Sequence, residues 1–128
     1  MKATSTNTHV QQAQSSFNCE AFLARVNNEL DQVLDLLELF LDIYPDSLRR
    51  IEAAVQQQDA DAIRETAHQF KGSLQFIHAE PAVAAAQRLE QIGRKHQADQ
   101  AAEAFDDLVG QIKELGHELR AFLAGSNR

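Results

Sequence analysis

The sequence has little of what several classes of protein require. It contains one cysteine, Cys19, no tryptophan, and a single methionine at its start. A lone cysteine cannot form an internal disulfide and has no second cysteine with which to build a thiolate metal site. Basic residues are also few, with 12 lysines and arginines against 19 acidic residues. The resulting net charge of -7 has the wrong sign for binding phosphate backbones, so nucleic acid is not an expected partner.

Long apolar runs are missing as well. No stretch approaches the roughly 20 residues of a membrane-spanning helix, and the N-terminus lacks the apolar segment of a signal peptide. We therefore expect no membrane association and a cytoplasmic location. Residues 1–16 are polar and aperiodic, which predicts a disordered tail. The remaining length and the 44% hydrophobic content predict one domain over residues 17–124, followed by a short tail at 125–128.

Within residues 17–124 the apolar residues recur at helical spacing, without the alternation typical of strands. The pattern predicts a short helix near residues 17–26 and then a long helix with Asn28 as its N-cap and Leu30 facing inward. Pro45 should either kink this second helix or divide it in two. Three further amphipathic helices follow, joined by short connections. We therefore predict an all-α fold, an antiparallel up-and-down four-helix bundle with a short N-terminal capping helix.

The helix that contains His68 has an unusual polar face. At ~100° per residue, His68 lies ~140° and Gly72 ~180° from the centre of the apolar stripe, while Arg64, Lys71 and Gln75 lie at ~80° to ~120°. Gly costs about 1 kcal/mol relative to Ala inside a helix, but here it removes a side chain one turn after His68 and lets a partner approach. Arg64 and Lys71 form a positive rim, which suits the making or receiving of an anion at the imidazole.

The next predicted helix has a matching set of polar residues. Gln87, Glu90 and Arg94 are spaced at i, i+3 and i+7, so they lie together off the apolar face and could flank His68 across the helix pair. Either Glu90 or Gln87 could accept a hydrogen bond from His68 Nδ1, which would leave Nε2 as the free nucleophile. The residues alone do not choose between these two acceptors.

The segments "AHQFKGS" and "RLEQIGR" resemble the signature of histidine-containing phosphotransfer (HPt) domains. In that signature a histidine is followed by any residue, an apolar residue, lysine, glycine, and serine or alanine, with Leu-Glu and Gly-Arg pairs on the following helix. The resemblance extends over residues 17–123. Each piece is weak alone, but their combination is specific.

The resemblance implies a role for each matching residue. It implies that His68 is phosphorylated, that Lys71 stabilises the charge of the phosphoryl group, and that Gly72 gives a receiver domain access. It also places Ser73 at the position of the family's small residue after the glycine and Arg94 at that of a frequent arginine. The chain would then be a phosphocarrier in a two-component phosphorelay.

In that role the chain would take a phosphoryl group from a receiver-domain aspartate, in a hybrid sensor histidine kinase or a response regulator, and pass it to another receiver. The receiver would supply Mg²⁺, and this chain would bind no cofactor, lack autonomous kinase activity and act as a monomer. Two departures from the family pattern concern packing. His78-Ala79 replaces a usual Gly-Ala pair, and Leu74 replaces a common small residue.

A second apolar stripe marks the long helix before Pro45, on the side away from its main stripe, and Phe76 also falls off the core face. Such a patch often marks a partner surface. The alternative is that the short first helix covers it, and the residues leave both possibilities open. The candidate docking residues are Leu36, Leu39, Ile43 and Phe76, and those that would cover them are Phe22, Leu23 and Val26.

Two other functions use the same residues. A degenerate adaptor would bind receiver domains without carrying phosphate. A metal-binding bundle is suggested by two Glu-x-x-His pairs, Glu65 with His68 and Glu114 with His117, because di-iron carboxylate proteins use this element. Ligands in such sites project inward, whereas both pairs are predicted to face outward and no inward glutamate is predicted. We therefore expect no metal site.

Overall fold

The structure is a computed structural model that describes residues 16–26 and 29–125. In these ranges it has five α-helices, one short 3-10 helix and no strand. They are α2 (Cys19–Arg25), α3 (Leu30–Gln56), α4 (Ala60–Phe76), α5 (Glu80–Arg94), η1 (Ala98–Gln100) and α6 (Ala101–Gly125). None of the described helices is both long and apolar enough to cross a membrane.

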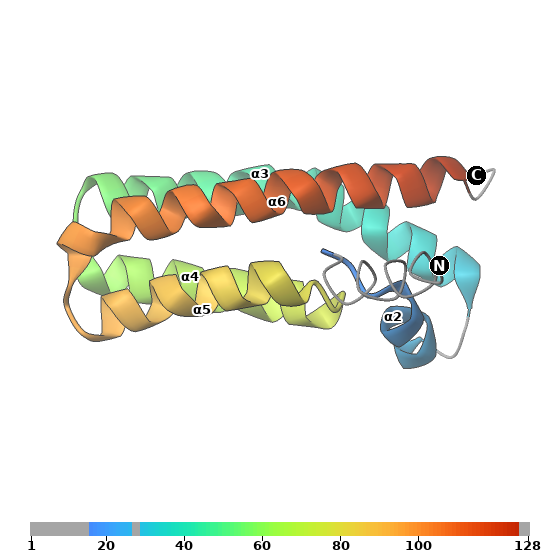
Figure 1. Cartoon of the computed structure of the whole chain (residues 1–128), viewed down its shortest axis with the longest axis horizontal. Helices are drawn as coiled ribbons and strands as arrows, with labels where there is room; N and C mark the ends of the chain where they lie inside the picture. Colours follow the sequence, from blue (N-terminus) through green and yellow to red (C-terminus); the bar gives the residue numbers. More distant parts are fainter. Residues whose placement is uncertain (1–15, 27–28, 126–128) are drawn as a thin grey trace, which may run out of the picture.

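The four long helices run up and down in two layers, with α3 beside α6 and α4 beside α5 (Figure 1). α4 packs against α3 and α5, and α6 packs against α5 and α3, so each long helix has two neighbours. α2 lies at the end of the bundle where α3 begins (Figure 1). The predicted antiparallel four-helix bundle with a small N-terminal helix is therefore confirmed.

Local signals fix where the helices begin. The Asn18 side chain accepts a hydrogen bond from the Ala21 amide at 3.0 Å at the start of α2, and the Asp59 side chain accepts from the Ala62 amide at 3.1 Å at the start of α4. Both satisfy amides that have no partner within the helix. α5 has no side-chain cap, but Pro81 occupies its first turn, where the missing N–H costs nothing.

α3 is one continuous helix of 27 residues with Pro45 inside it, so of the two alternatives predicted for this proline, a kink or a division, the division is excluded. The observed N-cap is Glu29, and the predicted cap, Asn28, lies outside the described residues. Leu30 was expected to face the core, but it is 45% exposed. The reason is that the end of α4 and the start of α5 both stop short of this first turn of α3 (Figure 1).

Ser16, the last residue of the predicted tail, packs within the fold. Ser16 is buried, and its amide donates a hydrogen bond to Glu118 Oε2 at 2.9 Å. Phe17 packs edge-on against Phe22 and Phe122, with ring centroids 6.1 Å and 6.0 Å away. These contacts close the end of the core. Residues 1–15 of the predicted tail lie outside the described residues.

Candidate functional site

His68 lies in the middle of α4 and leaves the bundle toward solvent. The rotation of α4 is fixed by the buried residues Ile63, Ala67, Phe70 and Leu74. His68 is therefore turned away from the core, as predicted, and its side chain is 63% exposed. One edge of its ring nevertheless touches a buried group on α5.

That group is Glu90, whose side chain is only 3% exposed. His68 Nδ1 lies 2.9 Å from Glu90 Oε2, Arg94 Nη2 donates to the same oxygen at 2.7 Å, and Lys71 Nζ lies 2.7 Å from Oε1. Oε1 has no hydrogen-bond partner among the described residues, so the contact with Lys71 is an ion pair and not a hydrogen bond. We call these four residues the Glu90 cluster. Arg94 thus meets His68's partner and not the imidazole itself.

The position of Glu90 corrects the sequence analysis, which placed it off the apolar face and predicted no inward glutamate. Ala86 and Gly93, one turn before and after Glu90, are both buried, and Gly93 lies directly against the backbone of α4. These small residues on both sides were the signal that this face is closely packed. Nevertheless, no group of three or more His, Cys, Asp or Glu side chains in the described part of the chain could hold a metal ion.

The cluster determines the protonation of Glu90. Burial by itself raises the pKa of this carboxyl, but Lys71 and His68 lower the pKa by more, so it lies below its usual value of 4.5. Glu90 is therefore ionised at neutral pH and can only accept hydrogen bonds. The proton in the short contact must then be on His68 Nδ1, so in the neutral imidazole Nε2 carries the lone pair.

Of the two candidate acceptors for Nδ1, Glu90 is the one that contacts His68. Gln87 instead accepts a hydrogen bond from Lys71 Nζ at 3.0 Å. Lys71 was predicted to be part of a positive rim in solvent, but its side chain is only 14% exposed because it reaches across to α5. Arg64 and Gln75 are exposed, one turn before and two turns after His68, and neither makes a hydrogen bond or ion pair with the Glu90 cluster within the described ranges.

Gly93 was matched to the family's Gly-Arg pair, but sequence reasoning gave it no role of its own. A Cβ at this position would lie 2.6 Å from the Ala60 carbonyl oxygen, 2.6 Å from the Arg64 amide nitrogen and 2.9 Å from Arg64 Cα. Only glycine permits so close an approach of two helix backbones. The contact holds α5 against α4 one turn away from Glu90, which brings this carboxylate within reach of His68.

Gly72 has the opposite surroundings. It is exposed, and a Cβ there would have no neighbour within 4 Å, so its packing does not require glycine. Gly72 lies instead at the edge of an apolar depression between two helices, which we call the α3–α4 groove. The groove is lined by Leu36, Leu39, Phe40, Ile43, Gly72, Ser73, Phe76 and Ile77.

The four predicted docking residues therefore come together in the α3–α4 groove. Leu39, Ile43 and Phe76 are 54%, 49% and 37% exposed, and Leu36 is half-buried. Of the two alternatives, coverage of the whole patch by α2 fails. α2 reaches Phe76, whose ring centroid lies 5.8 Å from that of Phe22 and 4.8 Å from the Arg25 guanidinium carbon, but Leu39 and Ile43 stay about half exposed. Most of the apolar patch stays open beside Gly72, one turn from His68.

The two departures from the family pattern lie in the packing around the end of α4. His78 has a φ of 61°, a left-handed conformation that costs most residues other than glycine about 1–2 kcal/mol. It ends α4, with its amide bonded to Gln75 O at 3.1 Å and its carbonyl accepting from Asn18 N at 3.1 Å. Leu74 is fully buried in the core. Neither residue belongs to the Glu90 cluster.

The family model described as Hpt domain matches residues 35–124, which include α4, α5 and the α3–α4 groove. No curated protein matches the chain. The crystal structure of histidine-containing phosphotransfer protein B (HptB) from Pseudomonas aeruginosa PAO1 has the same fold, with a TM-score of 0.74 and 22% identity over 87% of this chain and 93% of that one. The chain belongs to the Hpt domain family and is a histidine phosphotransfer protein of phosphorelays.

Proposed function

We propose that His68 Nε2 is the atom that carries the phosphoryl group, taken from the aspartyl phosphate of one receiver domain and given to the aspartate of another. The observation that supports this assignment best is the hydrogen bond between His68 Nδ1 and the buried Glu90 carboxylate, at 2.9 Å. It fixes the ring while leaving Nε2 unprotonated and directed outward. Phosphoryl transfer demands mainly such positioning together with charge stabilisation.

In the forward step, the lone pair of His68 Nε2 forms an N–P bond as the P–O bond to the receiver's aspartate breaks and the carboxylate leaves. No proton has to be transferred. The ring becomes an imidazolium as the bond forms, and the Glu90 carboxylate beside Nδ1–H stabilises that positive charge. The reverse sequence on a second receiver returns the imidazole to its neutral form.

The remaining residues act on the phosphoryl group and its donor. Lys71, one turn from His68, places a positive charge beside the transferred group, and the open position at Gly72 admits the receiver. The α3–α4 groove binds the receiver's apolar surface. The receiver holds Mg²⁺ at its aspartate, so the chain acts as a phosphocarrier and not as a kinase.

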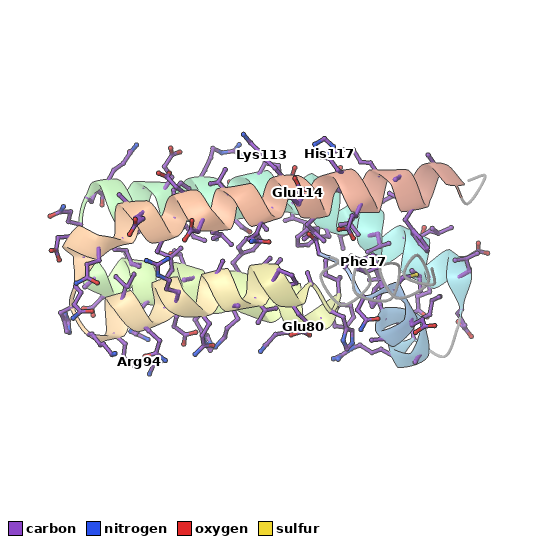
Figure 2. The ribbon with its side chains drawn as sticks, in the orientation of Figure 1. Phe17, Glu80, Arg94, Lys113, Glu114 and His117 are labelled. Carbon is purple, nitrogen blue, oxygen red and sulfur yellow. The ribbon has the colours of Figure 1, made fainter. Side chains whose placement is uncertain are left out.

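The test is transfer from a phosphorylated receiver domain in the presence of Mg²⁺, comparing wild type with His68→Gln. Wild type is expected to gain an acid-labile, base-stable phosphate, and His68→Gln to gain none. His117→Gln is the matched control, because His117 is an exposed histidine on α6, away from α4 (Figure 2), and it should be labelled like wild type.

Incubation with ATP alone should label none of the three proteins. Label on His68→Gln would contradict the assignment of the phosphorylated residue. Binding of a receiver to wild type without any transfer would instead favour the adaptor function.

A further inference from the structure

The α3–α4 groove has a charged flank on the side away from α4. Asp35, Glu38 and Asp42 each precede a groove residue of α3 by one position, that is Leu36, Leu39 and Ile43. At ~100° per residue along a helix, they form a stripe beside the apolar one. All three acidic residues are exposed. We call them the acidic flank. It ends at Asp46, which pairs with Arg49 and Arg50.

The opposite side of the groove carries the other sign. There α4 presents His68, and beyond it lie Lys71 and Arg94 on the side of α5. The face therefore changes from basic at the α4–α5 pair, through apolar in the α3–α4 groove, to acidic on the outer side of α3. This order along one face is a property of the arrangement of three helices and is not visible in any single one.

We propose that the receiver domains served by this chain carry a basic residue beside their apolar docking surface, placed to face the acidic flank, and that this charge selects among receivers. The inference rests on the proposed function and adds a selection rule to it. Apolar contact in the groove is non-directional and fits many receivers about equally well. A receiver with an acidic residue at this place is repelled, since like charges across an interface oppose association.

The charge order also sets the orientation of the receiver. The basic side attracts the phosphorylated aspartate toward His68, and the acidic flank attracts the basic residue to the other side of the groove. A receiver turned end for end would put its phosphoryl group against Asp35, Glu38 and Asp42 and be repelled. One docked orientation is therefore favoured before the apolar surfaces touch.

Asp42→Lys is the sharpest variant for a test. Asp42 is exposed and has no ion-pair partner within the described residues, so its reversal breaks no ion pair there. Glu114→Lys is the matched control with the same change in charge. Glu114 is exposed on α6 (Figure 2), two turns after Asp107, which pairs with Arg88 of α5, so it faces away from the α3–α4 groove.

The experiment measures the rate of phosphoryl transfer from a phosphorylated receiver that labels wild type, at subsaturating concentrations. At low salt, Asp42→Lys should slow transfer by about three- to tenfold, because charges at the rim of an interface act mainly on association. Glu114→Lys should stay within about twofold of wild type. The difference should disappear near 1 M salt, where the screening length is about 3 Å.

A receiver whose basic residue facing the acidic flank is changed to Glu should regain transfer with Asp42→Lys and lose it with wild type. Equal rates for Asp42→Lys and Glu114→Lys at low salt would overturn the inference, as would a faster Asp42→Lys or a loss that persists at high salt. Failure of wild type to accept phosphate from any receiver is a separate result, because it would contradict the proposed function itself.

Discussion

Gly72 and Gly93 lie on neighbouring helices, and glycine is used at each for a different reason. At Gly93 the backbone of α4 leaves no room for a side chain, whereas at Gly72 a Cβ would meet nothing within 4 Å. Glycine in a helix costs stability relative to Ala, and at Gly93 the close packing of two helices explains why glycine is used in spite of that cost. At Gly72 nothing among the described residues does, which agrees with the proposed access of a receiver domain to His68.

We therefore predict that Gly72→Ala raises stability and lowers function. The free energy of unfolding should rise by about 0.5–1 kcal/mol, because Ala is the better helix former and clashes with nothing. Phosphoryl transfer from a receiver should slow, since the new methyl group stands one turn after His68. Urea denaturation and transfer rates measure the two effects. A more stable variant with an unchanged rate would show that Gly72 does not serve access.

For single residues, the sequence predicted which residues gather around His68 better than it predicted how deeply each of them is buried. The predicted histidine, lysine, glycine and arginine do lie in one region, and the exposure of His68 followed from helical periodicity. The burial of Glu90 and Lys71 did not, because periodicity assigns each residue to a face of its own helix and ignores the neighbour. Glu90 is buried by the nearness of α4, and that nearness depends on a contact between backbones.

Among the helices, the pair α4 and α5 holds the residues of the proposed chemistry. His68 and Lys71 come from α4, and Glu90 and Arg94 from α5, so the Glu90 cluster forms only when the two axes are close. Gly93 sets that closeness. The sequence predicted both helices. It did not predict how close their backbones lie, because the apolar pattern of one helix carries no information about its distance from another.

Gly93→Ala should therefore damage both stability and transfer. A Cβ 2.6 Å from backbone atoms of α4 forces the helices apart, and we expect a loss of about 1–3 kcal/mol in the free energy of unfolding. Transfer should fall with it, because Glu90 moves away from His68. Gly110→Ala is the control on α6, where a Cβ meets nothing within 4 Å, and it should stabilise the protein slightly. Equal effects of the two substitutions would contradict this account of Gly93.

α3 shows where helix prediction succeeded and where it could not. Apart from Leu30, its apolar stripes were placed correctly, and they include the four residues of α3 that line the α3–α4 groove. Its continuity through Pro45 was not decided, because the loss of one hydrogen bond competes with packing along the whole helix. The exposure of Leu30 depends on where α4 and α5 end, which is again a property of other elements.

Over the whole molecule, the bundle joins two surfaces that the helices do not have separately. The α4–α5 pair holds a buried anion between two cations and the imidazole, and the α3–α4 groove supplies open apolar area beside it. Unpaired, the Glu90 carboxylate would be costly to bury, so the cluster has to form for the bundle to close around it. Folding and the readiness of His68 for transfer are thereby linked through one carboxylate.

This link predicts a pH dependence of global stability. The pKa of Glu90 is lowered in the folded protein, so its contribution is fully present above its usual pKa of 4.5 and is lost as the pH falls through the lower folded value. Glu90→Gln should lower the free energy of unfolding by about 1–3 kcal/mol at pH 7, since Lys71 and Arg94 lose their buried partner. Below pH 4.5 the gap to wild type should shrink, because wild type then loses the same charge.

Urea denaturation of wild type and Glu90→Gln from neutral pH into the acid range measures this gap. Glu114→Gln makes the same chemical change at an exposed position on α6 and should stay within about 0.5 kcal/mol of wild type throughout. Transfer by Glu90→Gln should also slow about tenfold, the equivalent of some 1.4 kcal/mol of lost stabilisation of the imidazolium. A gap that does not change on acidification would mean that Glu90 contributes shape and not charge. His68 would then owe its orientation to packing alone, and its transfer rate should survive the loss of the carboxylate.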